Sequence, residues 1–484
     1  MSAELEHVDV LIVGAGLSGI GAAAHLHRRC PEKNCLILEA RGAMGGTWDL
    51  FRYPGIRSDS DMYTLGYAFK PWTSPKAIAD GPAIRDYIKE TAAEHGIERK
   101  IRYGHKVVAA DWSSAGSLWR VEAESDGGTA FFTCRFLVMA AGYYDYDEAH
   151  RPRWKGEESF QGQIVHPQFW PETLDIHGKR IAIIGSGATA VTLAPELARE
   201  AAHVTMVQRT PSFIVSRPSV DSIAERLKRL LPQRTAYALT RWKNVLLTAF
   251  FYRLARRRPE RTAAKLVELV RAEIGAGFKA ADFTPPYKPW DQRLCLVPDG
   301  DLFEAIRDGN VSMATGAIER FTERGLDLVG GTAVEADVVI AATGLKVVTV
   351  GKVRLSIDGK PVNVPEAMVY KGMMLSDVPN LMFIFGYTNA SWTLKADLAC
   401  DYLVRLLKRM DKAEARAAVA RHDPDVPEIP FLDFTSGYVK RALPVLPRQG
   451  ARRPWRLYQN YWLDLLTLRF GRIEDGTLVL ERSA

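Results

Sequence analysis

The segment VDVLIVGAGLSG, residues 8–19, decides the fold of the amino-terminal part of the chain. Its first half is mostly apolar and β-branched, as in a strand buried on both faces of a parallel sheet. Glycines follow at positions 14, 16 and 19, and a helical pattern runs on to about residue 29. The next apolar strand, CLIL at residues 35–38, ends in Glu39. Strand, glycine turn, helix, strand and acid in this order predict a Rossmann-type dinucleotide-binding unit.

Each glycine of this turn has a separate physical role. Gly14 permits the tight turn, and Gly16 lets the backbone approach a pyrophosphate. Gly19 lets the helix pack closely on the strand, and the helix N-terminus supplies amide donors to the phosphates. Ser18, inside the same turn, is a further candidate contact, and Glu39 is expected to bind a ribose hydroxyl.

The same pattern recurs in RIAIIGSGATA, residues 180–190. After its helix, the strand HVTMV at residues 203–207 ends in Gln208 and Arg209 in place of an acid. An arginine there suits the 2′-phosphate of NADP, which an acid would repel. The different strand ends predict FAD in the first unit and NADPH in the second. The residues expected to cradle the NADPH pyrophosphate are Gly185, Ser186, Gly187, Ala188 and Thr189.

Composition limits the class of protein. The 484 residues suggest roughly three domains, and 47% hydrophobic with 25% charged residues is ordinary for folded cores. Apolar runs are too short to span a bilayer, no leader precedes the first strand, and five scattered cysteines predict neither a disulfide framework nor a metal site. We therefore expect a soluble cytoplasmic protein.

The net charge of +7 is concentrated in one region. Residues 223–271 contain 13 lysines and arginines against 3 acidic residues, so the rest of the chain is slightly acidic. With no groove-reading module, this distribution argues against nucleic-acid binding. Two interpretations of the basic segment stay open: a helical cap with a solvated face, and peripheral contact with a membrane surface.

The predicted fold class is α/β, with two Rossmann-like dinucleotide-binding domains and a helical insert. Apolar strands that end in small-residue turns, near residues 136–142 and 336–344, are expected where the chain crosses between domains. The predicted boundaries are 1–143 and 344–484 for the two segments of the FAD domain, 152–216 and 288–343 for the NADPH domain, and 217–287 for the insert.

Three further segments are rich in glycine, aromatic and charged residues and indicate a ligand surface. They are GGTWDLFRYPGIRSD at residues 45–59, FQGQIVHPQFWP at 160–171 and PWDQRLC at 289–295. Together with the two glycine turns they resemble the class B flavoprotein monooxygenases of Baeyer–Villiger type. Four stretches of sequence are most similar to the ethionamide-activating group of this family. They are the first and third of these segments, RWKN at 241–244 and GYTNASWTLKAD at 386–397.

This resemblance implies an enzyme in which NADPH reduces FAD and O₂ adds to the flavin as a C4a-peroxyflavin. The peroxyflavin would insert oxygen next to the carbonyl of a small apolar ketone, giving an ester or lactone, or would oxidise sulfides and thioamides. Arg293 matches the catalytic arginine of the family, whose charge stabilises developing anions. Asp59 matches the acid that holds it, as an ion pair in a dry pocket.

The resemblance also implies binding and structural residues. Those expected at the flavin or its nucleotide are Glu39, Thr47, Trp48, Asp49, Arg57, Ser58 and Val107. In the 160–171 segment, Phe160, Gly162, Trp170 and Pro171 are expected to pack, and His166 to couple domain motion. Many relatives carry a lysine before the catalytic arginine; here the position is Gln292, so selectivity for the 2′-phosphate depends on Arg209 alone.

Three rival functions are considered. A disulfide reductase also uses two dinucleotide folds, but Cys30 and Cys35 lie before Glu39, on the wrong side of the flavin. A monooxygenase restricted to sulfur and nitrogen would use the same intermediate and is not separated by sequence. A non-catalytic nucleotide-binding module that docks a partner through the insert is disfavoured by the presence of Arg293 and Asp59.

Overall fold

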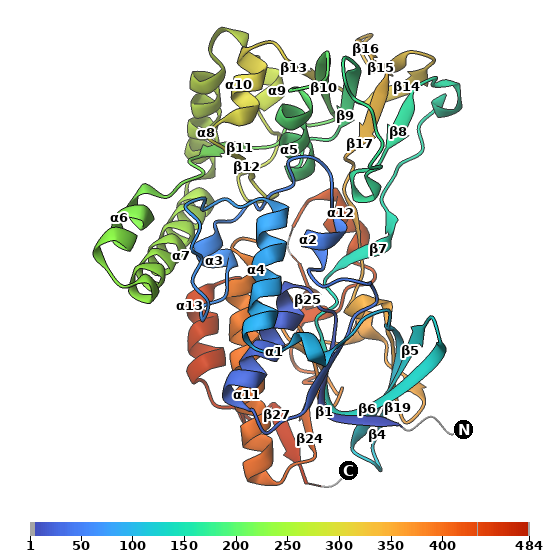
Figure 1. Cartoon of the computed structure of the whole chain (residues 1–484), viewed down its shortest axis with the longest axis vertical. Coiled ribbons are helices and arrows are strands. Elements are labelled where there is room, and N and C mark those ends of the chain that lie inside the picture. The colour runs from blue at the N-terminus through green and yellow to red at the C-terminus, as the bar shows by residue number, and fades with distance from the viewer. Residues whose placement is uncertain (1–4, 433, 483–484) are drawn as a thin grey trace.

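Two separate β-sheets organise the chain, one in the lower and one in the upper half of the view in Figure 1. The computed structural model describes residues 5–432 and 434–482. We refer to the lower sheet with its covering helices as the first unit and to the upper one as the second unit.

The first sheet has the strand order β20-β19-β4-β5-β6-β1-β2-β3, and β23 also pairs with β6. β1 is parallel to β2 and β6, whereas β4, β5 and β6 form an antiparallel meander. The strand bounds are β1 Glu6–Val13, β2 Cys35–Leu38, β3 Ile101–Arg102, β4 Lys106–Ser113, β5 Leu118–Ser125, β6 Gly128–Met139, β19 Arg354–Ile357, β20 Lys360–Pro361 and β23 Leu381–Phe383.

The core of the first unit lies on both faces of β1. Val10 and Ile12 face one buried apolar cluster and Leu11 and Val13 the other, because successive strand side chains alternate. Helices pack against the first of these clusters: α1 (Leu17–Arg29), α4 (Gly81–Glu94) and α11 (Trp392–Ala413).

The second sheet is parallel throughout, in the order β13-β10-β9-β17-β8. Its strands and the helices packed on it are β8 Gln163–Val165, β9 Arg180–Ile184, β10 His203–Gln208, β13 Val311–Thr315, β17 Val338–Ala341, α5 Ala188–Leu197 and α10 Asp301–Arg307. β17 is buried along its whole length, as a central parallel strand should be. Two units built on glycine turns confirm the predicted α/β class with two Rossmann-like folds.

Two of the segments in which the chain passes between the units lie side by side. β7 (Tyr144–Ala149) leaves the first unit and pairs antiparallel with β18 (Leu345–Val347), which follows β17 on the return. Asp145 of β7 is buried, and its carboxylate lies 2.6 Å from Lys352 Nζ. An ion pair therefore holds the two crossing segments together.

The segment expected as a helical insert is helical, but its helices divide between the two units. The bounds are α6 Ser222–Leu230, α7 Gln233–Arg257, α8 Pro259–Ile274 and α9 Ala280–Phe283. Tyr237 of α7 is buried in the first core, whereas Ile274 of α8 and Phe283 of α9 are buried in the second. The insert is therefore not one cap, because its apolar faces meet different cores. The predicted domain boundaries stay a prediction.

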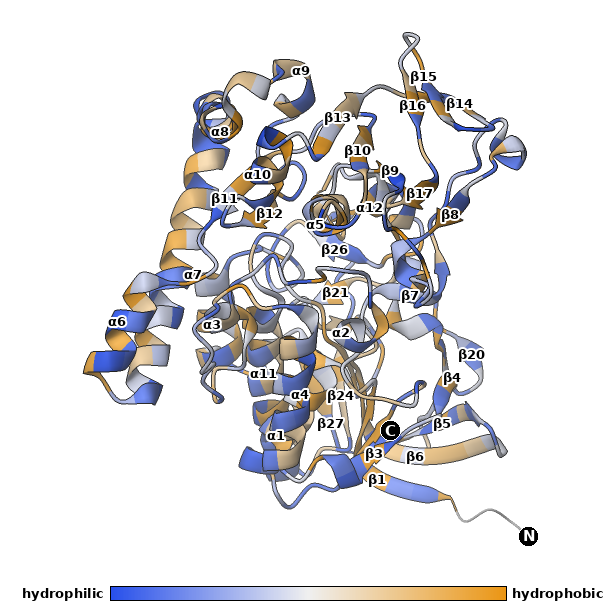
Figure 2. Ribbon diagram, turned by 45° about the horizontal axis from the view of Figure 1, so that its top comes forward, coloured by the Kyte–Doolittle hydropathy of each residue, from blue (hydrophilic) through white to orange (hydrophobic). Residues whose placement is uncertain are grey.

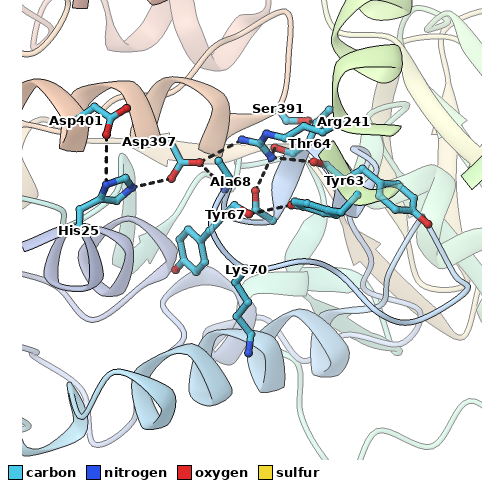
Figure 3. Close-up of polar contacts among 12 residues, drawn as sticks. His25, Tyr63, Thr64, Tyr67, Ala68, Lys70, Arg241, Ser391, Asp397 and Asp401 are labelled. Carbon is cyan, nitrogen blue, oxygen red and sulfur yellow. Dashed lines mark hydrogen bonds and ion pairs between the residues drawn. The ribbon is translucent and has the colours of Figure 1, made fainter. Parts of the chain in front are cut away.

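A buried polar network attaches α7 to the first unit (Figure 3). Arg241 donates from Nη1 to the carbonyl oxygens of Tyr63 (2.8 Å) and Gly66 (2.7 Å). Its Nη2 lies 3.1 Å from the carboxylate of Asp397 in α11. Asp397 in turn lies 3.2 Å from His25 Nε2 of α1 and accepts from the backbone of Ala68. Three helices distant in sequence, α1, α7 and α11, are thus joined through Asp397.

The remaining elements are short. They are α2 Thr47–Leu50, α3 Met62–Leu65, α12 Gly437–Ala442, α13 Tyr461–Asp464, β11 Ile214–Arg217, β12 Cys295–Pro298, β14 Ile318–Thr322, β15 Gly325–Leu328, β16 Ala333–Glu335, β21 Val369–Tyr370, β22 Met374–Leu375, β24 Ala417–Ala420, β25 Glu428–Pro430, β26 Arg448–Gly450, β27 Leu478–Glu481, the 3₁₀-helices η1 Glu98–Lys100, η2 Glu157–Ser159, η3 Pro167–Phe169, η4 Gly275–Gly277, η5 Val350–Lys352 and η6 Val364–Glu366, and the π-helix η7 Leu465–Phe470. Among the described residues, no helix combines the length and hydropathy of a bilayer-crossing segment.

Candidate functional site

A large cleft runs between the two units, and the segments singled out in the sequence meet along it. The predicted site residues that line this cleft are Gly14, Gly16, Ser18, Glu39, Thr47, Trp48, Arg57, Ser58, Asp59, Val107, Ala188, Thr189 and Arg293. They come from both glycine turns, from the 45–59 loop, from β4 and from the segment before β12. One cleft therefore collects residues of both units.

The first glycine turn has the geometry of a phosphate-binding turn. Gly14 has φ +103°, and a Cβ there would lie 2.8 Å from the carbonyl oxygen of Ala140. A Cβ on Gly19 would lie 1.9 Å from the carbonyl oxygen of Gly14, so α1 can pack on β1 only with glycine at this position. Gly16 begins α1 without a side-chain cap. The first amides of α1 are therefore available to an anionic group in the cleft.

Glu39 stands at the end of β2, beside this turn. Its carboxylate accepts from the backbone N–H of Ala15 at 2.7 Å and of Arg41 at 2.9 Å. Burial raises the pKa of Glu39, and the two backbone donors oppose that rise. Each carboxylate oxygen has a second acceptor site, so the side chain fits a ribose hydroxyl as well as its backbone partners.

The beginning of the 45–59 loop forms the short helix α2. Thr47 Oγ1 lies 3.2 Å from the hydroxyl of Tyr146, and Trp48 packs against the core of the first unit. Asp49 is buried and accepts from Arg41 at 2.7 Å. Asp49 therefore does not line the cleft, although the sequence placed it beside the flavin, because an arginine from the end of β2 turns its carboxylate inward.

The end of the same loop crosses to the second unit. Gly55 has φ +72°, and a Cβ there would lie 3.1 Å from Glu196 of α5. Arg57 forms an ion pair with Asp301 of α10, with Nη2 at 3.3 Å from the carboxylate. Burial raises the pKa of Tyr53 to about 12, and Thr189 of the second turn is its hydrogen-bond partner. The loop thus contacts both turns.

Arg293 and Asp59 meet across the cleft, Arg293 from the second unit and Asp59 from the loop of the first. Nη1 of Arg293 lies 3.7 Å from the Asp59 carboxylate, and the side chains are 37% and 31% exposed. The Asp59 carboxylate raises the pKa of Arg293 further above its ordinary value, so the guanidinium stays cationic. The pair lies in the cleft that both units line, and the dry pocket stays a prediction.

Aromatic side chains form a wall next to Arg293. Tyr143 stacks on Trp392 with ring centroids 5.1 Å apart, and Trp392 Nε1 donates to Ser18 Oγ at 2.8 Å. A small cavity beside them is lined by Tyr143, Arg293, Val347, Phe385, Tyr387, Thr388, Trp392, Leu432, Tyr438, Val439 and Ala442. The position of Tyr143 just beyond the carboxyl end of β6 was the available signal, since open α/β sheets bind ligands at that edge.

The second glycine turn repeats the geometry of the first. Gly185 has φ +147°, and a Cβ there would lie 2.4 Å from the carbonyl oxygen of Ala342. Gly187 begins α5 without a side-chain cap, and a Cβ there would meet no atom within 4 Å. Ser186 donates to the carbonyl oxygen of Thr210 at 3.0 Å. The turn therefore presents free backbone amides at an open surface.

The two residues that follow β10 have different environments. Gln208 is buried, and its amide nitrogen donates to the carbonyl oxygen of Asp282 at 2.8 Å and to Thr315 Oγ1 at 2.9 Å. Arg209 is exposed and forms no ion pair with a described residue. Of the two, only Arg209 has donors free for a 2′-phosphate, because the amide of Gln208 is already engaged by α9 and β13.

The 160–171 segment lies beside the cleft and packs against protein. Phe160 contacts Phe321 edge to face, and a Cβ on Gly162 would lie 2.3 Å from the carbonyl oxygen of Asp337. His166 caps η3, its Nδ1 accepting from the backbone of Gln168, and burial lowers its pKa.

The carboxyl end of this segment connects the second unit to the crossing strand. Trp170 packs on the core of the second unit, while Pro171 is exposed. Gln168 donates from Nε2 to the carbonyl oxygen of Asp145 in β7 at 2.8 Å. The segment therefore joins the second unit to the crossing strand, and the coupling of domain motion by His166 stays a prediction.

The thiols of Cys30 and Cys35 are free and buried. Burial raises the pKa of both, which makes each a poor nucleophile. Neither residue lines the cleft between the units. Their environment is that of small core residues.

Comparison with known proteins places the chain among flavin-dependent enzymes. Residues 11–245 match the family model described as pyridine nucleotide-disulphide oxidoreductase. The FAD-containing monooxygenase EthA of Mycobacterium tuberculosis is 54% identical over 476 residues, covering 98% of this chain and 97% of that protein. A probable FAD-binding monooxygenase, AlmA of Acinetobacter, is 46% identical over 98% of this chain and 96% of that protein.

Solved structures share the fold. Oxidized steroid monooxygenase bound to NADP superimposes with a TM-score of 0.78 at 21% identity, covering 99% of this chain and 100% of that one. A complex of OTEMO with FAD and NADP gives 0.70 at 23% identity, covering 86% and 88%. At these identities the likeness concerns the arrangement of the two units.

Proposed function

The chain belongs to the EthA-type FAD-containing monooxygenases, and from this premise we propose that it uses FAD, NADPH and O₂ to insert oxygen next to the carbonyl of an apolar ketone. We propose that the same site oxidises sulfides and thioamides. The observation that carries the proposal is the placement of Arg293, paired with Asp59, in a cleft lined by both nucleotide turns. A monooxygenase confined to sulfur and nitrogen is the alternative.

The residues of the first unit fit a bound FAD. The uncapped amides of α1 would hold the pyrophosphate, and Glu39 would accept a ribose hydroxyl while its two backbone donors fix its carboxylate. Thr47, Trp48 and Ser58 line the cleft, where the ring system would lie. Val107 lines it near Glu39, since the backbone N–H of His105 donates to the Glu39 carbonyl oxygen at 2.9 Å. When bound, the flavin supplies the reduction of O₂ and the transfer of one oxygen atom.

The residues of the second unit fit NADPH. The free amides at the start of α5 would bind its pyrophosphate, next to Thr189 and the exposed Arg209. Arg57 is held by Asp301 at the edge of the cleft, between the two nucleotide sites. Arg293 lies in the part of the cleft that both units share.

Arg293 would act on the reacting oxygen. Its guanidinium cannot lose its proton, and it presents fixed donors where negative charge develops on oxygen during transfer to the substrate. Asp59 keeps this group oriented from the opposite unit. The cavity beside it, lined by Tyr143, Trp392 and aliphatic side chains, supports an apolar substrate.

Replacing Arg209 with alanine is expected to lower the NADPH-over-NADH ratio of kcat/KM by about tenfold or more, since a charge-assisted contact is worth about 1.5–3 kcal/mol. With Gln292 in place of a lysine, we expect no other residue to compensate. The measurement is steady-state oxidation of each cofactor. The exposed Arg324→Ala is the matched control, and an unchanged ratio in Arg209→Ala would remove Arg209 from the phosphate site.

The proposed reaction is tested by product analysis. The FAD-loaded enzyme is given NADPH, isotopically labelled O₂ and a mixture of 2-decanone and thioanisole. We expect one labelled oxygen atom in an ester and one in a sulfoxide. Labelled sulfoxide without ester would replace the proposal by the heteroatom-only alternative, and NADPH oxidation with neither product would overturn both.

Where the reaction takes place is a separate question. We propose that the enzyme works in the cytoplasm and touches a membrane peripherally through the basic helices α6 and α7. The charge of the insert supports this contact.

A further inference from the structure

Helix α7 carries a row of exposed apolar side chains along its outer side. Trp242, Leu246 and Phe250 follow one another at intervals of four residues, so they lie on one helix face. Leu246 is 51% exposed and Phe250 60%, and Leu247 and Phe251 widen the row. The opposite side of α7, which includes Arg241 and Val245, is buried. A row of large apolar side chains such as these is normally buried in the interior of a protein.

The row continues onto neighbouring helices. Trp242 stacks on Trp462 of α13 with ring centroids 5.2 Å apart. Leu466 and Phe470 of η7 follow Trp462 at the same four-residue spacing, and Phe470 is 69% exposed. These helices lie together on the left side of Figure 1. We define the outer apolar face as Ile223, Leu230, Leu239, Trp242, Leu246, Leu247, Phe250, Phe251, Leu254, Leu466 and Phe470.

Positive charge accompanies this face. In Figure 2 hydrophobic and hydrophilic segments alternate along the projecting α6 and α7. The exposed arginines of these two helices that form no ion pair with a described residue are Arg226, Arg229, Arg234, Arg253 and Arg257. The acidic Glu225 is already paired with Lys228. The face therefore combines apolar area with uncompensated positive charge.

We propose that the outer apolar face docks on an anionic phospholipid bilayer, with α6, α7 and η7 lying along its surface. The apolar side chains would enter the boundary between headgroups and acyl chains, and the arginines would contact lipid phosphates. A second copy of the chain is a poorer occupant, because it would bring the same positive charge to the contact.

The face is connected to the candidate active site. Near the end of α7, Tyr252 contacts Trp290 edge to face at 5.4 Å, and Arg256 lies 2.6 Å from Asp291. Arg293 follows two positions later in the same segment. Docking would thus bring lipophilic substrates from the bilayer toward the site. That consequence rests on the proposed function, and the docking specifies the membrane contact proposed there.

Flotation of the full-length protein with vesicles tests the docking. We expect the protein to float with vesicles of phosphatidylcholine and phosphatidylglycerol in equal parts at low salt. We expect weaker binding at high salt and with phosphatidylcholine alone. The double substitution Phe250→Asp and Phe251→Asp should weaken binding by at least about tenfold. Val329→Asp, which alters an exposed apolar residue of the second unit, should bind as the wild type does.

Circular dichroism and size-exclusion chromatography accompany the flotation. They show whether a variant that fails to bind vesicles is folded and whether the protein is a dimer. Circular dichroism spectra equal to those of the wild type show that the double variant is folded. If the double variant is not folded, the single variant Leu246→Ser replaces it in the flotation test. Wild-type protein that stays with the buffer at low salt would overturn the proposal. So would a folded double variant that floats as well as the wild type, or a wild-type dimer that the double variant dissociates.

Discussion

Replacing Arg293 with alanine is expected to lower kcat for oxygen transfer by about a hundred- to a thousandfold, or about 3–4 kcal/mol of transition-state stabilisation. The guanidinium is the cationic group that Asp59 holds at the meeting point of both nucleotide turns. Without it, charge that develops on oxygen would face the cleft with no fixed donor. Flavin content and the affinity for NADPH should change little.

The measurement is formation of ester and sulfoxide per NADPH oxidised. Arg293→Lys keeps the charge but loses the planar fork, so an intermediate rate is expected. Lys288→Ala, an exposed change in the same segment, is the matched control. Wild-type turnover in Arg293→Ala would exclude the role assigned to this arginine. That result would leave the residues assigned to FAD and NADPH binding untouched.

Replacing Arg241 with methionine is expected to reduce the free energy of unfolding by about 3–5 kcal/mol, the usual effect of removing one partner of a buried ion pair. Methionine retains much of the volume but none of the donors. The carboxylate of Asp397 would lose its guanidinium partner, and the carbonyl oxygens of Tyr63 and Gly66 would lose their donor. All of these groups lie in the interior shown in Figure 3.

Urea unfolding followed by tryptophan fluorescence measures this effect. Arg234→Met on the same helix is the matched control, because Arg234 is exposed and has no ion pair within the described part of the chain. If Arg241→Met and Arg234→Met unfold at the same urea concentration, the network does not stabilise the attachment of α7.

The features that could be predicted from the sequence depend on short motifs and on local hydrophobic patterns. Both glycine turns follow from their own motifs, because the positive φ values at Gly14 and Gly185 favour glycine. The burial of β1 on both faces follows from its apolar run. The meeting of Arg293 with Asp59 was implied by the family resemblance, since no local pattern connects residues so distant in sequence.

The features of the site and of the insert that could not be predicted from the sequence depend on tertiary contacts. Asp49 turns away from the cleft because Arg41 engages it, and Gln208 is engaged by α9 and β13. The helices of the insert divide between two cores that only the folded chain defines. The aromatic wall combines Tyr143 with Trp392, which lie far apart in the sequence. In each case the deciding partner belongs to another element.

Because β7 and β18 run beside each other, two of the covalent connections between the units lie on one line, while the segments before α6 and after α7 form two more. The buried attachment of α7 to the first unit therefore restrains a swing about that line. The Asp59–Arg293 pair also joins the two units, with 3.7 Å between the carboxylate and Nη1. Separating this pair would take the Asp59 carboxylate away from the Arg293 guanidinium. The relative position of the two units therefore also determines how much positive charge the cleft exposes.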